Sequence, residues 1–261
     1  MREFLDDAQA HRQDGYGRAQ AHAKRELPKR FYKEATVKPL ESGFAVGLDG
    51  RVPRTPGMKQ VVVPKAALAE AMAAEWTAQG EFIDPETMPM VRLVNSAVEA
   101  GDEGRPALMA EIVKYIGSDL MLYRADAPET LVARQEELWD EALLRLARRF
   151  GVSFQPTIGI RHQAQPPSTL TRLGDALAGE ELFPLAAMNA VMSITGSGLL
   201  ALALRHGLLD AEQVWVAAHV DEDHNIQLWG EVEEIVERRA KRRKEFDAAA
   251  QMLRMWERPR S

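Results

Sequence analysis

The first part of the chain shows the alternation of apolar and polar residues that is typical of half-buried strands. Phe31, Ala35 and Val37 alternate with Tyr32, Glu34, Thr36 and Lys38, and an apolar run, FAVGL, follows at 44–48. The dipeptide Asp49-Gly50 comes next and favours a tight hairpin, because both of its residues tolerate a positive φ. A further apolar run lies at 61–63. Residues 30–63 are therefore predicted to form a small antiparallel sheet.

After the sheet the apolar spacing changes from two residues to three or four. Leu68, Met72 and Trp76 recur at helical spacing between Pro64 and Gly80, which predicts a helix between these two helix-limiting residues.

The remainder of the chain has helical spacing almost throughout. In the segment 129–150 apolar residues line one face, and Gly151 is expected to end that helix. Asp210 with Gln213 forms a candidate capping box for the last helix, and Gly230 is expected to bend or break it. The predicted helices cover about 90–100, 105–117, 129–150, 168–178, 183–206 and 211–255.

Strands that precede a long run of helices indicate an α+β fold. We expect a small antiparallel β-rich N-terminal domain followed by a larger all-helical domain. The expected boundaries are an N-terminal helical or extended arm at 1–28, a β-rich domain with one helix at 29–88, and a helical domain at 89–261.

Composition narrows the possible functions. The net charge of −6 over 261 residues disfavours general binding to nucleic acid, which attracts proteins through Lys and Arg. The absence of cysteine excludes a disulfide framework, a thiolate metal site and a cysteine nucleophile. The N-terminus lacks the apolar run of a secretory signal and carries early acidic residues, so we expect a cytoplasmic protein without a transit peptide.

One segment, Leu182 to Leu204, contains no charged residue and is long enough to cross a bilayer. It includes several polar and glycine positions, and no second such segment accompanies it. A helix buried on all sides is therefore favoured over a membrane span.

Charge is segregated near the C-terminus. Residues 211–237 contain eight Asp or Glu and no Lys or Arg, whereas 238–244, with the sequence RRAKRRK, contain six basic residues and no acid. This pattern predicts two oppositely charged surfaces, which suit docking to a macromolecule better than turnover of a small substrate.

Two other interpretations of this region stay open. His219, Asp223 and His224 have spacings that allow pairs of side chains to share a metal, although no other helix supplies the carboxylates of a di-metal site. The basic run Arg238–Lys244 allows binding to nucleic acid or anionic lipid, but such runs more often face solvent or pair with acids of their own chain.

Motifs for catalysis are scarce. The chain has no GxxxxGK[ST] phosphate loop, no GxGxxG after a strand and no GxSxG elbow. Ser197 lies in Gly-Ser-Gly within an apolar helical pattern, where small residues allow close packing of helices. We therefore expect a protein that is not an enzyme and needs no cofactor. The five tryptophans are expected to be mostly core residues. Trp229 is the exception left open: acids and Gly230 flank it, so it is either a half-exposed anchor of the interface or a core residue that orients its helix.

Several short motifs follow one another in the order found in a known family. They are KRFYK at 29–33, LDGRxxxTP at 48–56, Glu75-Trp76 with Gln79, Met88-Pro89, SDLMLYR at 118–124, Gln135 with Trp139-Asp140, Thr195-Gly196-Ser197 and DExxxxQxWG at 221–230. Together they resemble the ATP synthase assembly chaperone family that serves the α subunit of the catalytic head. The resemblance covers about residues 29–234.

The resemblance implies a non-enzymatic chaperone that binds the free α subunit and prevents its aggregation until the β subunit pairs with it. Members have a β-rich N-terminal domain and a helical domain, and occur in mitochondria and in some bacteria. Without a transit peptide, this chain resembles a bacterial, cytoplasmic member. We expect it to be monomeric when free, with no nucleic-acid partner and no stable membrane insertion. A functional acidic position of the family falls best on Asp221, and the predicted α-binding face comprises Asp221, Glu222, Trp229, Glu231 and Glu233.

Overall fold

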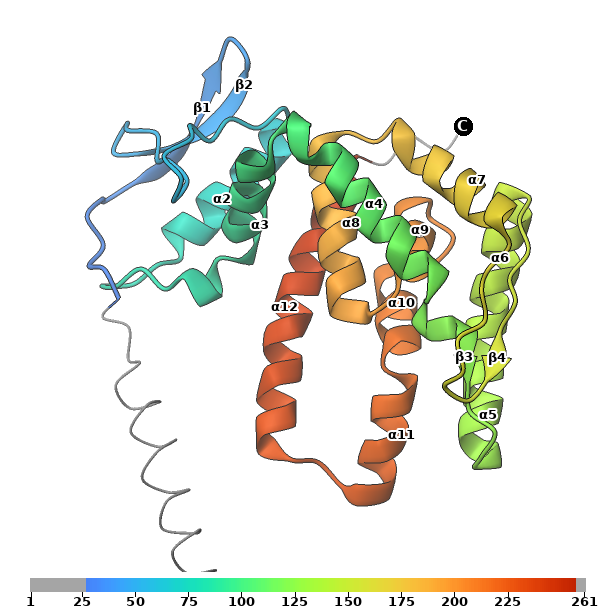
Figure 1. Cartoon of the computed structure of the whole chain (residues 1–261). Coiled ribbons are helices and arrows are strands. Elements are labelled where there is room, and N and C mark those ends of the chain that lie inside the picture. Colours follow the sequence, from blue (N-terminus) through green and yellow to red (C-terminus); the bar gives the residue numbers. More distant parts are fainter. Residues whose placement is uncertain (1–26, 257–261) are drawn as a thin grey trace, which may run out of the picture.

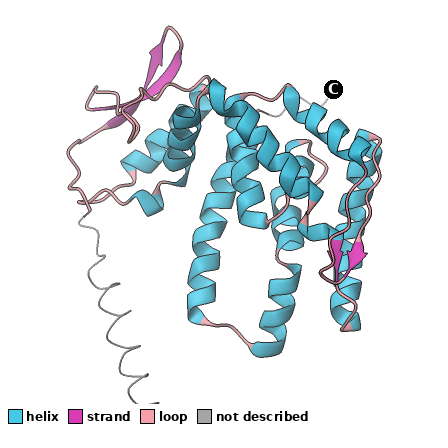
Figure 2. Cartoon of the chain, in the orientation of Figure 1, coloured by secondary structure: helices cyan, strands magenta, loops and turns pink. Residues whose placement is uncertain are grey.

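A computed structural model describes residues 27–256, and it confirms the predicted α+β class. A two-stranded sheet near the N-terminal end is followed by a region that is mostly helical (Figures 1 and 2). The predicted arm at 1–28 falls almost entirely outside the described residues. The predicted domain boundaries stay a prediction, although buried side chains from Tyr32 to Trp256 join one continuous hydrophobic cluster.

The sheet consists of β1 (Ala35–Leu40) and β2 (Gly43–Leu48), which pair in antiparallel register. The predicted hairpin turn at Asp49-Gly50 is confirmed: φ is 46° at Asp49 and 83° at Gly50, and Leu48 bridges to Arg51. The third apolar run forms only an isolated bridge, between Phe44 and Val63, instead of a full strand.

Helix α2 (Ala66–Thr77) follows the sheet and packs against both of its strands. It begins two residues after Pro64 and ends three residues before Gly80, within the predicted limits. Near its C-terminal end the Glu75 carboxylate accepts hydrogen bonds of 2.8 Å from the backbone N–H groups of Met90 and Val91. These groups lie in the first turn of α3 (Pro89–Ala100), where helix N–H groups lack partners, so Glu75 joins the β-rich part to the helices.

The helical region has α8 (Leu182–Thr195) at its centre, packed against α3, α4 (Arg105–Gly117), α9 (Gly198–Arg205) and α12 (Glu233–Met255). Most of its side chains are buried, as predicted for this apolar segment. The other helices are α5 (Glu129–Gln135), α6 (Glu141–Phe150), α7 (Pro167–Ala178), α10 (Ala211–Ala218) and α11 (Val220–Trp229). Four short helical turns occur at 85–87, 102–104, 120–122 and 136–140.

The predicted helix at 129–150 is confirmed as a continuous element. A π-helical turn, Glu136–Asp140, connects α5 to α6, and Gly151 ends α6 with φ of 64°. The expectation of an all-helical second domain needs one correction, because β3 (Tyr123–Arg124) pairs in parallel with β4 (Thr157–Ile158).

The prediction of a single helix at 183–206 is wrong. The segment is divided at Gly196, which has φ of 72°, into α8 and α9. Ser197 precedes α9, and its hydroxyl accepts a hydrogen bond from the Leu200 N–H at 2.9 Å. The serine is therefore the N-cap of α9, whereas the sequence pattern placed it inside a helix. The Thr195 hydroxyl donates to the Val191 carbonyl, as expected. Among the described residues no helix has the length and apolar character that a membrane crossing requires.

The single long helix predicted at 211–255 is also wrong in part. Gly230 does break it, as expected, but a second break at His219 separates α10 from α11. The capping box formed by Asp210 and Gln213 at the start of α10 is confirmed. Residues 211–255 therefore form three helices, α10, α11 and α12. Helices α11 and α12 lie side by side, and the loop that connects them lies at the lower edge of the molecule in Figure 1.

Candidate partner-binding site

Helices α11 and α12 form a helical hairpin whose end we call the tip, residues 225–237. Four of the eleven exposed large apolar side chains among the described residues lie here: Leu228, Trp229, Val232 and Val236. The Trp229 side chain is 84% exposed, whereas Trp139, Trp215 and Trp256 are buried. Contiguous exposed apolar side chains of this kind mark interaction sites in soluble proteins.

Acidic side chains lie in the tip and in the first turn of α11 that precedes it. Asp221, Glu231 and Glu233 are exposed and Glu222 is half-buried. Within residues 27–256 no ion pair to Lys or Arg includes any of these four carboxylates. The tip therefore has a strongly negative surface around an exposed aromatic side chain.

A cavity of about 590 Å³ opens between α11, α12 and the C-terminal end of α8. Glu222 and Trp229 both line it, which agrees with the expectation that residues seven apart on one helix lie near each other. Glu231 lines a second hollow of about 430 Å³, which shares Ile226 and Ile235 with the first. Glu222 and Glu231 therefore line different hollows of the same hairpin, and the predicted α-binding face stays a prediction.

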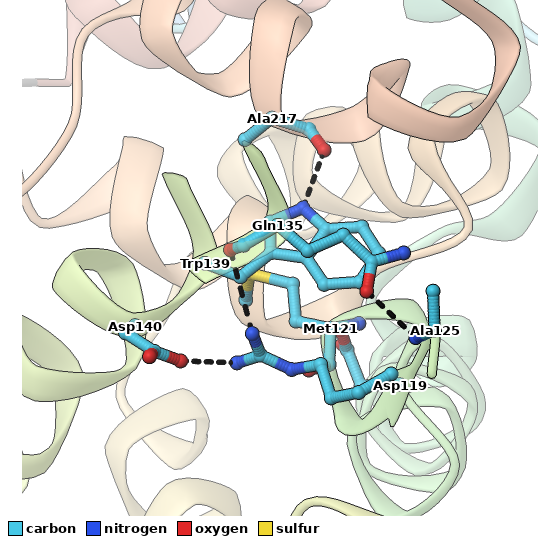
Figure 3. Close-up of polar contacts among 8 residues, drawn as sticks. Asp119, Met121, Ala125, Gln135, Trp139, Asp140 and Ala217 are labelled. Atoms are coloured by element: carbon cyan, nitrogen blue, oxygen red, sulfur yellow. Dashed lines mark hydrogen bonds and ion pairs between the residues drawn. The ribbon is translucent and has the colours of Figure 1, made fainter. Parts of the chain in front are cut away.

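Asp221 is held in place by a residue from a distant segment. The side-chain amide of buried Gln135 donates to the Asp221 carboxylate at 2.7 Å, while its carbonyl oxygen accepts from the Ala125 N–H at 2.8 Å. Figure 3 shows the bond to Ala125. The orientation of Asp221 is thus set by α5, although its helix lies at the surface.

Further contacts fix the junction between α10 and α11. The indole N–H of Trp139, which is fully buried, donates to the carbonyl of Ala217 at 2.7 Å (Figure 3). Arg124 lies over the Trp139 ring and donates to the Asp140 carboxylate at 2.7 Å. Three of the sequence motifs, at 118–124, 135–140 and 221–230, therefore meet at the start of α11 and stabilise it.

Substitution of Gln135 by alanine is expected to lower the free energy of unfolding by about 1–3 kcal/mol, because the half-buried Ala125 N–H loses its acceptor and the buried amide no longer holds Asp221. Thermal or urea unfolding measures this change. Alanine in place of exposed Gln227, on α11, is the control and should have little effect. An unchanged stability of the Gln135 variant would show that the Gln135 contacts do not hold this junction.

The metal-site interpretation of His219, Asp223 and His224 receives no support. Buried His219 donates from Nδ1 to the Trp215 carbonyl at 2.7 Å, and burial lowers its pKa. Asp223 instead forms an ion pair with Arg239. In the described part of the chain, no three His, Asp or Glu side chains gather as metal ligands.

Half of the six basic side chains in the run pair with acids of their own chain. Arg239 binds Asp223 at 2.5 Å, Lys241 binds Glu86 at 3.1 Å, and Arg243 binds Glu212 at 2.7 Å. The prediction of two separate charged surfaces is therefore wrong in part. Because the chain reverses at Gly230, the basic run on α12 lies opposite the acids of α10 and α11 and partly neutralises them, while the tip stays acidic.

Sequence reasoning placed Gln135 in a family motif but missed its contact with Asp221, and it missed the apolar lining formed by Ile226, Val232 and Ile235. An apolar residue that recurs every three or four positions before and after Gly230 is a weak signal for that lining. No signal in the sequence identifies Gln135 as the partner of Asp221, since 86 residues separate them.

Comparisons with known proteins agree on one group of relatives. A family model described as ATP12 chaperone protein matches residues 29–147. The crystal structure of the Atu1473 protein of Agrobacterium tumefaciens is 40% identical in sequence, with a TM-score of 0.85 over 94% of this chain and 92% of that one. Atp12 of Paracoccus denitrificans is 34% identical, with a TM-score of 0.81 over 88% of this chain and 99% of that one. The mitochondrial protein atp12 of Schizosaccharomyces pombe is 24% identical over 220 residues, which are 79% of this chain and 75% of that protein.

Proposed function

This chain belongs to the ATP12 chaperone family, and from that premise we propose that it binds the free α subunit of the ATP synthase catalytic head. It keeps the α subunit from aggregating until the β subunit pairs with it, and it has no catalytic activity of its own. It does so as a monomer, in the cytoplasm of a bacterium.

The observation that carries this proposal is the exposure of Trp229 among unpaired acids at the tip. An exposed tryptophan in a soluble domain costs solvation free energy, and aromatic side chains surrounded by polar groups often dominate the binding energy of interfaces. An unassembled α subunit exposes the apolar surface that its partner subunit later covers, and such a surface drives association. The tip offers a complementary apolar surface of small area.

The charges of the tip suit a partner that must be released. Exposed carboxylates such as Glu231 and Glu233 speed the encounter with a basic surface and set specificity, but they add little affinity. A β subunit that buries a larger apolar area on the α subunit then displaces the chaperone. The contacts of Gln135 and Trp139 hold the start of α11, the helix that carries Trp229, and this lowers the entropic cost of binding.

A nucleic-acid or lipid adaptor is the weaker proposal. Such an adaptor needs free cations, and three side chains of the run Arg238–Lys244 form ion pairs within the chain.

Light scattering by purified α subunit tests the chaperone proposal. We expect an equimolar amount of this protein to suppress aggregation, and Asp221→Lys to weaken binding about tenfold or more because it reverses a charge at the interface. Asp221→Asn keeps an acceptor for Gln135 and is expected to have an intermediate effect. Glu70→Lys reverses an exposed charge on α2 and is the control. Equal protection by wild type and Asp221→Lys would remove Asp221 from the binding face.

A further inference from the structure

The cavity beside the tip has an apolar wall that no other part of the described chain fills. Ile226 and Trp229 line it from α11, and Val232 and Ile235 line it from the loop and α12. Its floor is the end of α8, where Ser193 is exposed. Its volume of about 590 Å³ lies within the range of about 300–1,000 Å³ that is usual for ligand pockets. The cavity therefore has room for more than one large side chain.

The mouth of the cavity is negatively charged. Residues 220–237 contain seven Asp or Glu and no Lys or Arg. Glu222 lines the cavity, and the His219 imidazole lies beside its carboxylate, with Nε2 at 3.8 Å from the nearer carboxylate oxygen. Because burial lowers the pKa of His219, this ring is neutral at pH 7 and does not neutralise the carboxylate.

The nearest permanent cations are engaged elsewhere. Arg242, at the inner end of the cavity, donates to the Ile194 carbonyl at the end of α8. Arg239 pairs with Asp223 in the second hollow, on the other side of the hairpin. The carboxylate of Glu222 therefore has an apolar surface beside it, and no Lys or Arg of the described residues forms an ion pair with it, although Arg242 lines the inner end of the same cavity.

We propose that this cavity receives a segment of the client α subunit that presents apolar side chains next to a basic residue. The apolar side chains pack against Ile226, Trp229 and Ile235, and the basic residue pairs with Glu222 at the mouth. A segment seated between two helices in this way follows the helix-in-groove mode of peptide recognition. The inference rests on the proposed function and adds to it the chemistry of the segment that is held.

Blocking the cavity tests the inference without changing the tip. Ser193→Trp places a large side chain on the floor from an exposed position of α8, so the fold should tolerate it, and capture of the α subunit should weaken at least tenfold. The matched control is Ser168→Trp, at an exposed position of α7 outside the cavity. Thermal unfolding of both variants checks that they fold like the wild type.

Photo-crosslinking then identifies the bound segment. Benzoylphenylalanine at Asn225, which lines the cavity, is expected to crosslink to an α-subunit peptide that contains apolar residues and Lys or Arg. The same group at Gln227, which is exposed but outside the cavity, should crosslink less.

The outcomes separate this inference from the proposed function. Unchanged capture by Ser193→Trp, an acidic or wholly polar crosslinked peptide, or crosslinks to a second copy of this chain would overturn the cavity inference while wild-type capture still supports the chaperone role. Failure of the wild type to bind the α subunit would overturn both.

Discussion

Replacement of Trp229 by serine is expected to weaken the affinity for the α subunit about 30-fold or more and to leave the stability of the chaperone itself unchanged. The affinity falls because an aromatic anchor at an interface typically contributes about 2 kcal/mol or more. The stability stays the same because the side chain is 84% exposed and buries little apolar surface on folding. Titration of immobilised α subunit gives the affinity, and thermal unfolding gives the stability.

The control for Trp229 is Leu144→Ser, which removes an exposed apolar side chain from α6, far along the chain from the tip. We expect this variant to bind like the wild type. If both variants bind equally well, exposed Trp229 is not part of the interface, and its exposure no longer supports the tip as the binding site.

Replacement of Asp119 by alanine is expected to lower the free energy of unfolding by about 3–5 kcal/mol. The fully buried carboxylate accepts hydrogen bonds from the Ser197 hydroxyl at 2.7 Å, the Leu199 N–H at 2.9 Å and the Met121 N–H at 3.2 Å. Alanine leaves these donors without a partner, at about 1–3 kcal/mol for each buried group. Urea unfolding measures the loss.

The control is Asp126→Ala, which removes an exposed carboxylate from the same part of the chain and should cost little. A loss below about 1 kcal/mol for the Asp119 variant would contradict the view that this residue fastens the start of α9 to the preceding helices.

The contribution of Asp119 is also expected to depend on pH. Burial raises the pKa of this carboxyl from 3.8 to about 7, even though several hydrogen bonds to the carboxylate act to lower it. Between about pH 4 and 7 the folded state therefore holds a proton that the unfolded state has lost, so the stability due to Asp119 falls as pH rises through this window. The stability difference between wild type and Asp119→Ala, measured from pH 4.5 to 8, should decrease with pH. A difference that increases with pH would contradict this assignment.

Local features of the fold were predictable from sequence. The hairpin at Asp49-Gly50, the end of α6 at Gly151 and the capping box at Asp210 each depend on a few adjacent residues with strong backbone preferences. The acidic neighbours of Trp229 made exposure one of two open possibilities, and the structure decides between them, since the side chain is 84% exposed.

The breaks inside apolar segments were not predictable by the same means. Hydrophobic spacing runs without interruption through Gly196-Ser197, but buried Asp119, 78 residues away, supplies the acceptor for the Ser197 hydroxyl at the new helix start. At His219 the α10–α11 break has no glycine or proline to mark it. Long-range partners decide both positions, and a local pattern does not contain them.

The candidate site was predictable as a list of residues but not as a shape. The acids and the tryptophan follow from the sequence, whereas the cavity depends on the reversal of the chain at Gly230 and on the end of α8, which forms its floor. The same reversal brings Arg239 opposite Asp223 and leaves the acids of the tip unpaired.

Capture of purified ATP synthase subunits by the immobilised full-length protein tests the central claim most directly. We expect retention of the α subunit when it is added alone, no retention of the β subunit when it is added alone, and release of the α subunit when the β subunit is added afterwards. Failure to retain the α subunit, or equal retention of both subunits with no release, would contradict the account.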